Sequence, residues 1–204
     1  MEKEDSQKVN LEKDKTYIET HLKDLDSLFK LHISETKKQN KELFDHWKKP
    51  KWDEYFMAMA VLISMRSVDT SQKNGCVIVD KNNKVLSIGY NGFPKGSKDH
   101  LIPLTRPEKY LFIEHAEKNA ILNKQFDITD STLYVTAYPC LACLRSILQS
   151  GIKHVIYLDK IKTRNITPED EKAIKILTHG RENFKLEKFD KDPKLKKLLE
   201  MVKS

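Results

Sequence analysis

Two short stretches of the sequence, His115-Ala116-Glu117 and Pro139-Cys140-Leu141-Ala142-Cys143, decide both the fold and the chemistry open to this chain. They supply one imidazole and two thiols, which are typical ligands of zinc. Structural zinc sites are closed by four protein ligands, whereas catalytic sites use three and leave the fourth tetrahedral position to water. The set of His115, Cys140 and Cys143 therefore predicts a catalytic zinc site.

Glu117 follows the ligand His115 by two positions and is predicted to move protons rather than bind the metal. Zinc lowers the pKa of a bound water from 15.7 to roughly 7, which makes hydroxide available at neutral pH. A carboxylate beside it can take a proton from that water and deliver protons to a ring nitrogen and a leaving amino group. Residues two apart point about 200° away from each other on a regular helix. We therefore expect both side chains to share one pocket at the first turn of a helix.

The Cys140/Cys143 pair has two other interpretations. A CxxC pair can be a redox dithiol, but this interpretation leaves the nearby His115-Ala116-Glu117 unexplained. A structural zinc would need a fourth protein ligand, and neither Cys76 nor a further histidine lies at paired ligand spacing. Cys76 begins an apolar run, Cys76 to Val79, which is typical of a small buried residue.

Composition favours one principal domain in a reducing compartment. The chain has 204 residues and three cysteines, a number that suits one domain and a cytoplasmic location. Its start, Met1 to Asp5, is acidic and polar, unlike a signal peptide. No stretch approaches the ~20 apolar residues of a membrane span, so no membrane partner is expected.

The net charge favours a small anionic ligand. A formal net charge of +7 is a mild basic surplus for this length, and it suits a nucleotide phosphate. A surface for nucleic acid would show dense Lys/Arg clusters interleaved with aromatic residues, and the sequence has none. We therefore expect a small-molecule substrate rather than a nucleic acid partner.

The two ends of the chain extend a central domain at 51–190. Residues 1–50 are strongly charged and predict a helical extension. The apolar positions that form its amphipathic stripe are Ile18, Leu22, Leu25 and Phe29. Such a helix could pack on the domain or on a neighbouring subunit, bind a separate partner, or stay disordered. Asp192-Pro193 marks the start of a C-terminal helix within 191–204.

Alternating helix and strand patterns predict a three-layer α/β/α fold. Strands are expected over 75–79, 85–89, 132–136, 154–158 and 184–187. Helices are expected over 52–66, from Pro107 through Ile121, from Pro139 to Gly151, and from Pro168 to His179. Proline suits a helix entrance because its missing N–H has no partner there. This order gives a mixed sheet of about five strands with helices on both faces.

Several longer segments resemble the deoxycytidylate (dCMP) deaminase family. H-x-E followed by P-C-x-x-C is the zinc signature of nucleobase deaminases, and it is complete in this chain. The matching segments, spread over about 52–160, are Trp52 to Met57, Arg66-Ser67, Gly89 to Gly96, His115 to Ile121, Tyr138 to Cys143 and Ser150 to Lys153. The resemblance implies a cytidine-deaminase-like fold and one Zn²⁺ per subunit.

The resemblance also implies hydrolytic deamination of dCMP to dUMP, which supplies thymidylate synthesis. In that family the Asn of the Asn-Gly loop contacts the substrate sugar, so Asn91 inherits this role, and Arg66 is a candidate for the phosphate. The alternative for Asn91 is that its loop contacts no ligand. The alternative for Arg66 is an ion pair at the surface or at an interface. Ala116, Tyr138 and Pro139 flank the zinc ligands and are also assigned to substrate binding. Family members usually form dimers or hexamers, so a homo-oligomer is expected.

The segment between the Asn-Gly loop and the zinc His departs from the family pattern. Some members bind a second zinc there through extra Cys or His residues, whereas residues 99–114 offer only His100. We therefore predict a single zinc. Members regulated by dCTP and dTTP carry Cys and paired Asp after the last Gly of the loop, where this chain has Ser97-Lys98-Asp99. This segment gives no support to dCTP or dTTP as effectors.

Other functions share the zinc motif. The chain could deaminate another base, nucleoside or nucleotide, or a polynucleotide whose flanking phosphates it would have to grip. A deaminase-like binding module is a fourth function, but the presence of Glu117 argues against it because such a module would not need the proton shuttle. Ammonia release from a panel of cytosine, adenine and guanine compounds would separate these functions.

Overall fold

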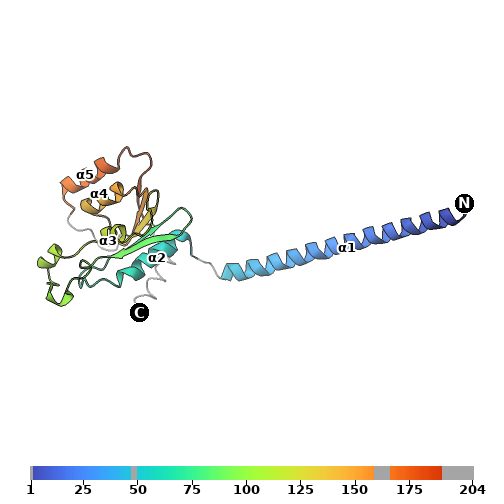
Figure 1. Ribbon diagram of the computed structural model, residues 1–204, viewed down its shortest axis with the longest axis horizontal. Helices are drawn as coiled ribbons and strands as arrows, with labels where there is room; N and C mark the ends of the chain where they lie inside the picture. Colours follow the sequence, from blue (N-terminus) through green and yellow to red (C-terminus); the bar gives the residue numbers. More distant parts are fainter. Residues whose placement is uncertain (1, 47–49, 159–165, 190–204) are drawn as a thin grey trace. The chain divides into compact units, whose positions relative to one another are not determined.

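The structure is a computed structural model that describes residues 2–46, 50–158 and 166–189 (Figure 1). Contacts divide the chain into two compact units, Met1–Lys49 and Pro50–Ser204. The C-terminal helix that the sequence predicts within 191–204 lies outside the described residues. No helix in the described part of the chain is long and apolar enough to cross a membrane.

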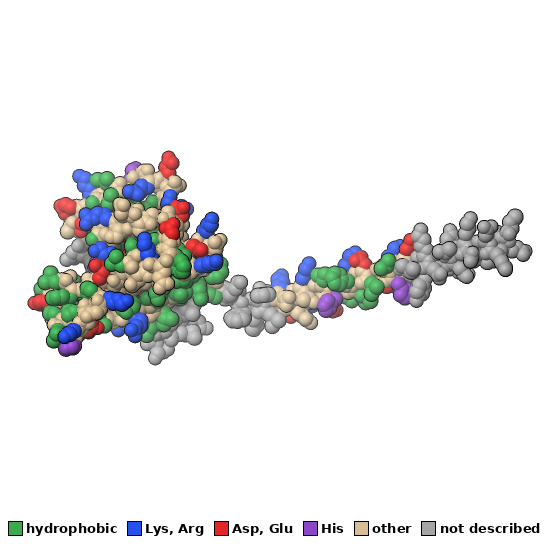
Figure 2. Space-filling model, viewed as in Figure 1, with side chains coloured by type: hydrophobic (Ala, Val, Ile, Leu, Met, Phe, Trp, Pro, Cys, Tyr) green, Lys and Arg blue, Asp and Glu red, His purple; other side chains and the backbone are tan. Residues whose placement is uncertain are grey.

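The first unit contains the single long helix α1 (Glu2–His46). Its sequence has no Gly or Pro, the two residues that most disfavour a helix interior. Leu22, Leu25 and Phe29 of the predicted stripe are all more than half exposed. Figure 2 shows apolar side chains beside Lys, Asp and His side chains along this helix. Within α1 itself, these three apolar side chains are therefore not covered, and Ile18, the fourth residue of the stripe, lies outside the described side chains.

The second unit is built on a five-stranded mixed sheet. Its strands are β1 (Gly75–Val79), β2 (Val85–Tyr90), β3 (Thr132–Val135), β4 (His154–Tyr157) and β5 (Lys185–Lys188). They lie in the order β2-β1-β3-β4-β5. Strand β1 runs antiparallel to β2 and β3, whereas β3, β4 and β5 are parallel. Each of the five predicted strands is present, and the predicted fold class is confirmed.

Helices cover both faces of this sheet, as Figure 1 shows. They are α2 (Trp52–Ser64), α3 (Ala116–Leu122), α4 (Leu141–Gln149) and α5 (Pro168–Thr178), with short 3-10 turns η1 (Asp99–Leu101) and η2 (Glu108–Leu111). Helix α2 packs on one face, α3 and α4 pack on the other, and α5 packs against α4. This arrangement makes three layers.

Strand periodicity explains why the sheet has two apolar faces. Successive side chains of a strand point to opposite faces, so Val77 joins the core beneath α2 while Cys76 and Ile78 join the core beneath α3 and α4. All five residues of β1 are buried because β1 lies inside the sheet and is covered on both faces. Cys76 is fully buried, as its apolar surroundings in the sequence predict.

A close approach of α3 to β2 fixes where His115, the residue before α3, can lie. A Cβ at Gly89 would clash with the carbonyl oxygen of Ala116 and the backbone of Ala120. Only glycine therefore lets the backbone of α3 lie directly on the strand. The Ser87 hydroxyl donates a 2.6 Å hydrogen bond to the carbonyl of Ala120 and ties the two elements together.

The prediction of one continuous helix from Pro107 through Ile121 is wrong. The chain forms η2 and then an extended segment, and α3 begins only at Ala116. The reason is a two-residue bridge in which Glu114 N–H donates to Gly92 O at 2.8 Å and Gly92 N–H donates to Glu114 O at 3.1 Å. These bonds use the backbone groups that a helix would need, and they place the loop after Asn91 beside the zinc His.

Candidate active site

The three predicted metal ligands lie at the N-terminal ends of two helices. His115 is the N-cap of α3 and Cys140 is the N-cap of α4, each with an extended backbone, and Cys143 lies in the first turn of α4. His115 Nδ1 is 3.3 Å from Cys143 Sγ and 3.5 Å from Cys140 Sγ, and the three ligand atoms all lie within 4.8 Å of one another. Ligand atoms around one tetrahedral zinc are roughly 3.5–3.8 Å apart, given its bond lengths. The set therefore fits one zinc ion.

The charge state of the two thiols also fits a cation. The Cys143 thiol donates a hydrogen bond to Cys140, which lowers the pKa of Cys140 to about 3, and this bond together with burial raises the pKa of Cys143. The pair alone thus holds one negative charge. A zinc ion between the sulfurs would stabilise the thiolate at both positions, and the N-terminus of α4 favours the same charge.

Glu117 lies beside this ligand set. It occupies the first turn of α3, and because His115 is an N-cap with extended backbone, the helical 200° separation does not apply to the pair. Glu117 is 5% exposed. Burial raises the pKa of Cys76, and the charge of Glu117 raises it further. The carboxylate is therefore shielded from bulk water, and its charge raises the pKa of the Cys143 thiol as well as that of Cys76.

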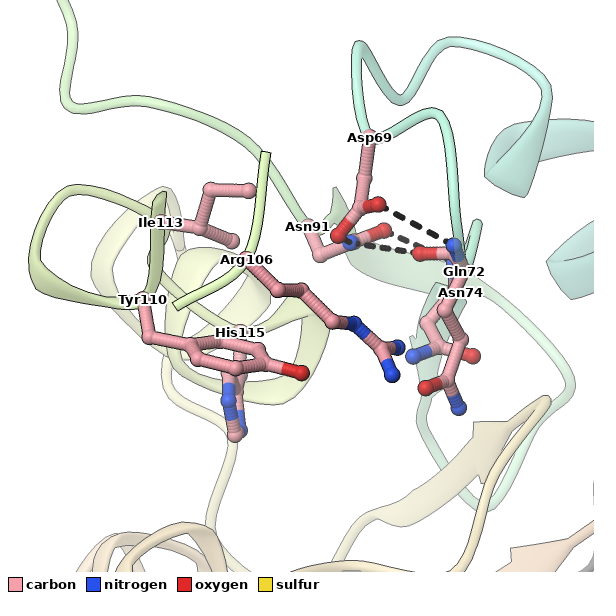
Figure 3. A pocket seen from close by; sticks show the side chains of 8 residues that line it. All are labelled: Asp69, Gln72, Asn74, Asn91, Arg106, Tyr110, Ile113 and His115. Carbon is pink, nitrogen blue, oxygen red and sulfur yellow. Dashed lines mark hydrogen bonds between the residues drawn. The ribbon is translucent and has the colours of Figure 1, made fainter. Parts of the chain in front are cut away.

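A pocket of about 330 Å³ adjoins His115 (Figure 3). This volume lies at the lower end of the usual range for small-molecule sites, ~300–1,000 Å³. Three segments far apart in the sequence form its lining, which consists of Asp69, Gln72, Asn74, Asn91, Arg106, Tyr110, Ile113 and His115. A ligand in this pocket would have one end next to a metal ligand and the other among polar side chains.

Asn91 holds one wall of the pocket together. Its side-chain NH₂ donates to the carbonyl of Gln72 at 2.8 Å and to Asp69 Oδ2 at 3.3 Å, and its Oδ1 accepts the backbone N–H of Asn74 at 2.7 Å. Both amide hydrogens are therefore used, and one lone pair of Oδ1 remains. A contact with a sugar would thus run from a sugar hydroxyl to Oδ1, and this role stays a prediction.

A buried ion pair joins this wall to the opposite one. Lys109 Nζ donates to Asp69 Oδ1 at 2.6 Å and to Ser71 Oγ at 2.9 Å, and the Lys109 side chain is 0% exposed. Burial raises the pKa of Asp69, but hydrogen bonds from Lys109 and from the backbone N–H groups of Ser71 and Gln72 lower it more, so its pKa lies below the usual value of an aspartate. The charged pair fixes the loop after α2 against η2.

Replacing Lys109 by methionine should lower the free energy of unfolding by about 3–5 kcal/mol, because the substitution leaves the buried Asp69 charge without its partner. Urea unfolding of the zinc-loaded protein measures this loss. The matched control is Lys175→Met, which removes an exposed pair with Glu171 and should cost at most about 1 kcal/mol. Equal losses in both variants would show that the buried pair does not hold the pocket walls.

The remaining predicted site residues lie in different places. Arg66 is exposed at the C-terminal end of α2 and does not line the pocket. Tyr138 packs edge-on against Tyr157, with 4.8 Å between ring centroids, and lines a second cavity beside α5. Ala116 and Pro139 are buried next to the zinc ligands. The substrate roles of these four residues stay predictions.

Sequence reasoning missed most of the pocket lining. Asp69, Gln72 and Asn74 stand in a polar segment with no motif of their own. Arg106 and Tyr110 belong to a basic and aromatic cluster, Arg106 to Tyr110, that shortly precedes the zinc His. That cluster was a usable signal, but its proline also suits a helix start, which the sequence pattern favoured.

Residues 50–159 match the family described as the cytidine and deoxycytidylate deaminase zinc-binding region. Deoxycytidylate deaminase of Mus musculus is 45% identical over 114 residues, which cover 52% of this chain and 64% of the mouse protein. The match thus spans less than two thirds of that relative's length. The family match at residues 50–159 contains the three predicted zinc ligands, Glu117, Asn91 and Arg106.

Solved structures agree with this match. The crystal structure of dCMP deaminase from the cyanophage S-TIM5 in apo form is 30% identical, with a TM-score of 0.51, and the likeness covers 69% of this chain and 99% of that one. The structure of the same phage protein in complex with dCMP and dUMP is 29% identical, with a TM-score of 0.52, and the coverage is 69% and 98%.

Proposed function

The chain belongs to the family of cytidine and deoxycytidylate deaminases, and from this membership we propose that it converts dCMP and water into dUMP and ammonia. The observation that carries the proposal is the grouping of His115, Cys140 and Cys143 around one point, with Glu117 beside them. The pocket that adjoins His115 offers room for a small nucleotide.

Each residue of the site has a separate role in the proposed reaction. His115, Cys140 and Cys143 would hold a zinc ion, which supplies a water of pKa roughly 7 when bound. The water oxygen forms a bond to C4 of the cytosine ring, and the bond from C4 to the amino nitrogen breaks. The Glu117 carboxylate carries both protons of the water, one to N3 of the ring and one to the departing ammonia. Asn91 orients the sugar through its Oδ1.

Further parts of the proposal rest on the sequence and on family membership. They are one zinc ion per subunit, a dimeric or hexameric assembly, a cytoplasmic location, and a catalytic domain over residues 51–190 that follows a helical extension. Comparison of the elution volume of the zinc-loaded protein with that of size standards would test the assembly.

The substrate itself is tested by comparing dCMP with deoxycytidine. The phosphate offers two or more charge-assisted hydrogen bonds, each worth about 1.5–3 kcal/mol. We therefore expect kcat/KM for dCMP to exceed that for deoxycytidine by at least about 10²-fold if this energy is expressed in the transition state. Ammonia release, followed at equal enzyme concentrations, gives both values.

Two results would contradict this assignment. Equal rates on dCMP and deoxycytidine would indicate a nucleoside deaminase. Activity on single-stranded DNA together with no activity on dCMP would indicate a polynucleotide deaminase, which acts on a base splayed out of its strand.

A further inference from the structure

One cation of the pocket has no part in the deamination chemistry. Arg106 lines the same pocket as His115, and Figure 3 shows its side chain reaching from the side of Tyr110 toward Asn74. Its guanidinium carbon lies 5.6 Å from the centroid of the Tyr110 ring. This stacking orients the guanidinium plane without using its five N–H donors, which therefore remain available to a ligand.

The charge of Arg106 is not balanced within the pocket lining. The carboxylate of the lining, Asp69, is already paired with Lys109 at 2.6 Å, so that pair is neutral. Among the residues that the structure describes, Arg106 takes part in no ion pair within 4.0 Å. The pocket therefore offers one uncompensated positive charge, and that charge favours an anionic group on the ligand.

The backbone around Arg106 is anchored, which makes the guanidinium a preorganised donor. The N–H of Lys109 donates to the carbonyl of Thr105 at 3.0 Å. The Lys109 side chain is held by Asp69 and Ser71 on the opposite wall. An arginine presented from an anchored turn loses less conformational entropy on binding than one on a loose loop.

The position of Arg106 relative to the metal ligands suits a nucleotide. The base must lie next to His115 and Glu117, where the proposed chemistry occurs. The other end of a ligand in this pocket then meets Arg106 and the neutral amides of Gln72 and Asn74. In a nucleoside monophosphate the 5′-phosphate is the charged group at the far end from the base, and a guanidinium binds phosphate oxygens through paired N–H bonds.

We propose that Arg106 binds the 5′-phosphate of the substrate and sets the preference for the nucleotide over the nucleoside. This inference rests on the proposed function, because it deepens the assignment of the same pocket. It assigns phosphate binding to Arg106, just before η2, whereas the sequence offered Arg66 after α2 as one candidate.

The first test compares two substrates in three variants. Arg106→Gln should lower kcat/KM for dCMP by about 10- to 100-fold, the loss expected for hydrogen bonds to a charged group, and should change the value for deoxycytidine less than threefold. Arg106→Lys keeps the charge without the paired donors and should lie between wild type and Arg106→Gln on dCMP. Arg181→Gln, an exposed substitution after α5 and outside the pocket lining, should leave both values unchanged.

The second test measures binding without chemistry. Calorimetry measures the binding of the two products, dUMP and deoxyuridine. The Kd for dUMP should be about 10- to 100-fold higher in Arg106→Gln than in wild type, and the Kd for deoxyuridine should not change. An unchanged Kd for dUMP would overturn the role of Arg106, as would an equal loss for dUMP and deoxyuridine. A loss of dUMP affinity in Arg66→Gln, with none in Arg106→Gln, would show that Arg66 binds the phosphate instead.

The two tests separate the failure of this inference from the failure of the proposed function. A wild-type protein that releases no ammonia from dCMP would overturn the deaminase assignment, and the dUMP measurement would still decide the role of Arg106. A wild-type protein that prefers dCMP, with an unchanged preference in Arg106→Gln, would overturn the role of Arg106 alone.

Discussion

Replacing Glu117 by glutamine should lower kcat for dCMP by about 10⁴-fold while the protein keeps its fold and its zinc. General acid–base catalysis is typically worth 10²–10⁴-fold, and we expect the upper end because in the proposed reaction one carboxylate carries both protons of the water. Glutamine has nearly the same volume, so the 5% exposed site stays filled. Steady-state ammonia release from dCMP, measured beside the zinc content, checks this result.

Two observations would contradict this role of Glu117. Activity within tenfold of wild type would remove the residue from the proton transfers. Loss of zinc in Glu117→Gln would mean that the carboxylate acts as a metal ligand. The matched control is Glu169→Gln, which changes an exposed carboxylate in the first turn of α5, outside the pocket lining. This control should keep wild-type turnover.

Removing the zinc should reduce ammonia release from dCMP below detection, and adding back one equivalent of Zn²⁺ should restore it. The reason is the nucleophile, because uncoordinated water has a pKa of 15.7 rather than roughly 7. Elemental analysis should find one zinc per chain before chelation. Cys143→Ser should lower this zinc content and the activity together, since the site would lose one of its two thiolates.

Cys76→Ala is the control for the metal site. Cys76 is fully buried in the sheet, and it does not belong to the ligand group of His115, Cys140 and Cys143. Its substitution should leave one zinc per chain. If zinc content falls as far in Cys76→Ala as in Cys143→Ser, the site is closed by four protein ligands and is structural. Full activity after complete zinc removal would refute a zinc-dependent reaction.

Local patterns in the sequence were enough for the sheet and for the grouping of the metal ligands. The five strands follow from runs of apolar residues between turns, and the two-residue period of a strand assigns Cys76 and Val77 to opposite faces. His115, Cys140 and Cys143 could be grouped as ligands of one metal because the sequence places them near the starts of two helices. These patterns depend only on residues that are close in the sequence, so they can be recognised before the fold is known.

The walls of the pocket could not be predicted in the same way. In the sequence, Lys109 stands beside Glu108 and resembles an ordinary surface lysine. In the structure it is fully buried against Asp69, which lies 40 positions earlier. The family resemblance assigns Asn91 to the substrate sugar, yet most of its side-chain hydrogen bonds go to the backbone of residues 72–74. Each of these contacts exists only because β1, β2 and the segment before α3 are brought together.

The sequence by itself therefore determined where the strands lie along the chain, and it predicted the donor set and the proton-carrying carboxylate, because these depend on side-chain chemistry and on local periodicity. Only the tertiary structure decided where helix α3 begins and that Arg106 lines the same pocket as His115. The backbone bridge between Gly92 and Glu114 and the ion pair between Asp69 and Lys109 overrode the local preference for a helix after Pro107. Both join residues that no local pattern relates, and their geometry follows from how the chain packs.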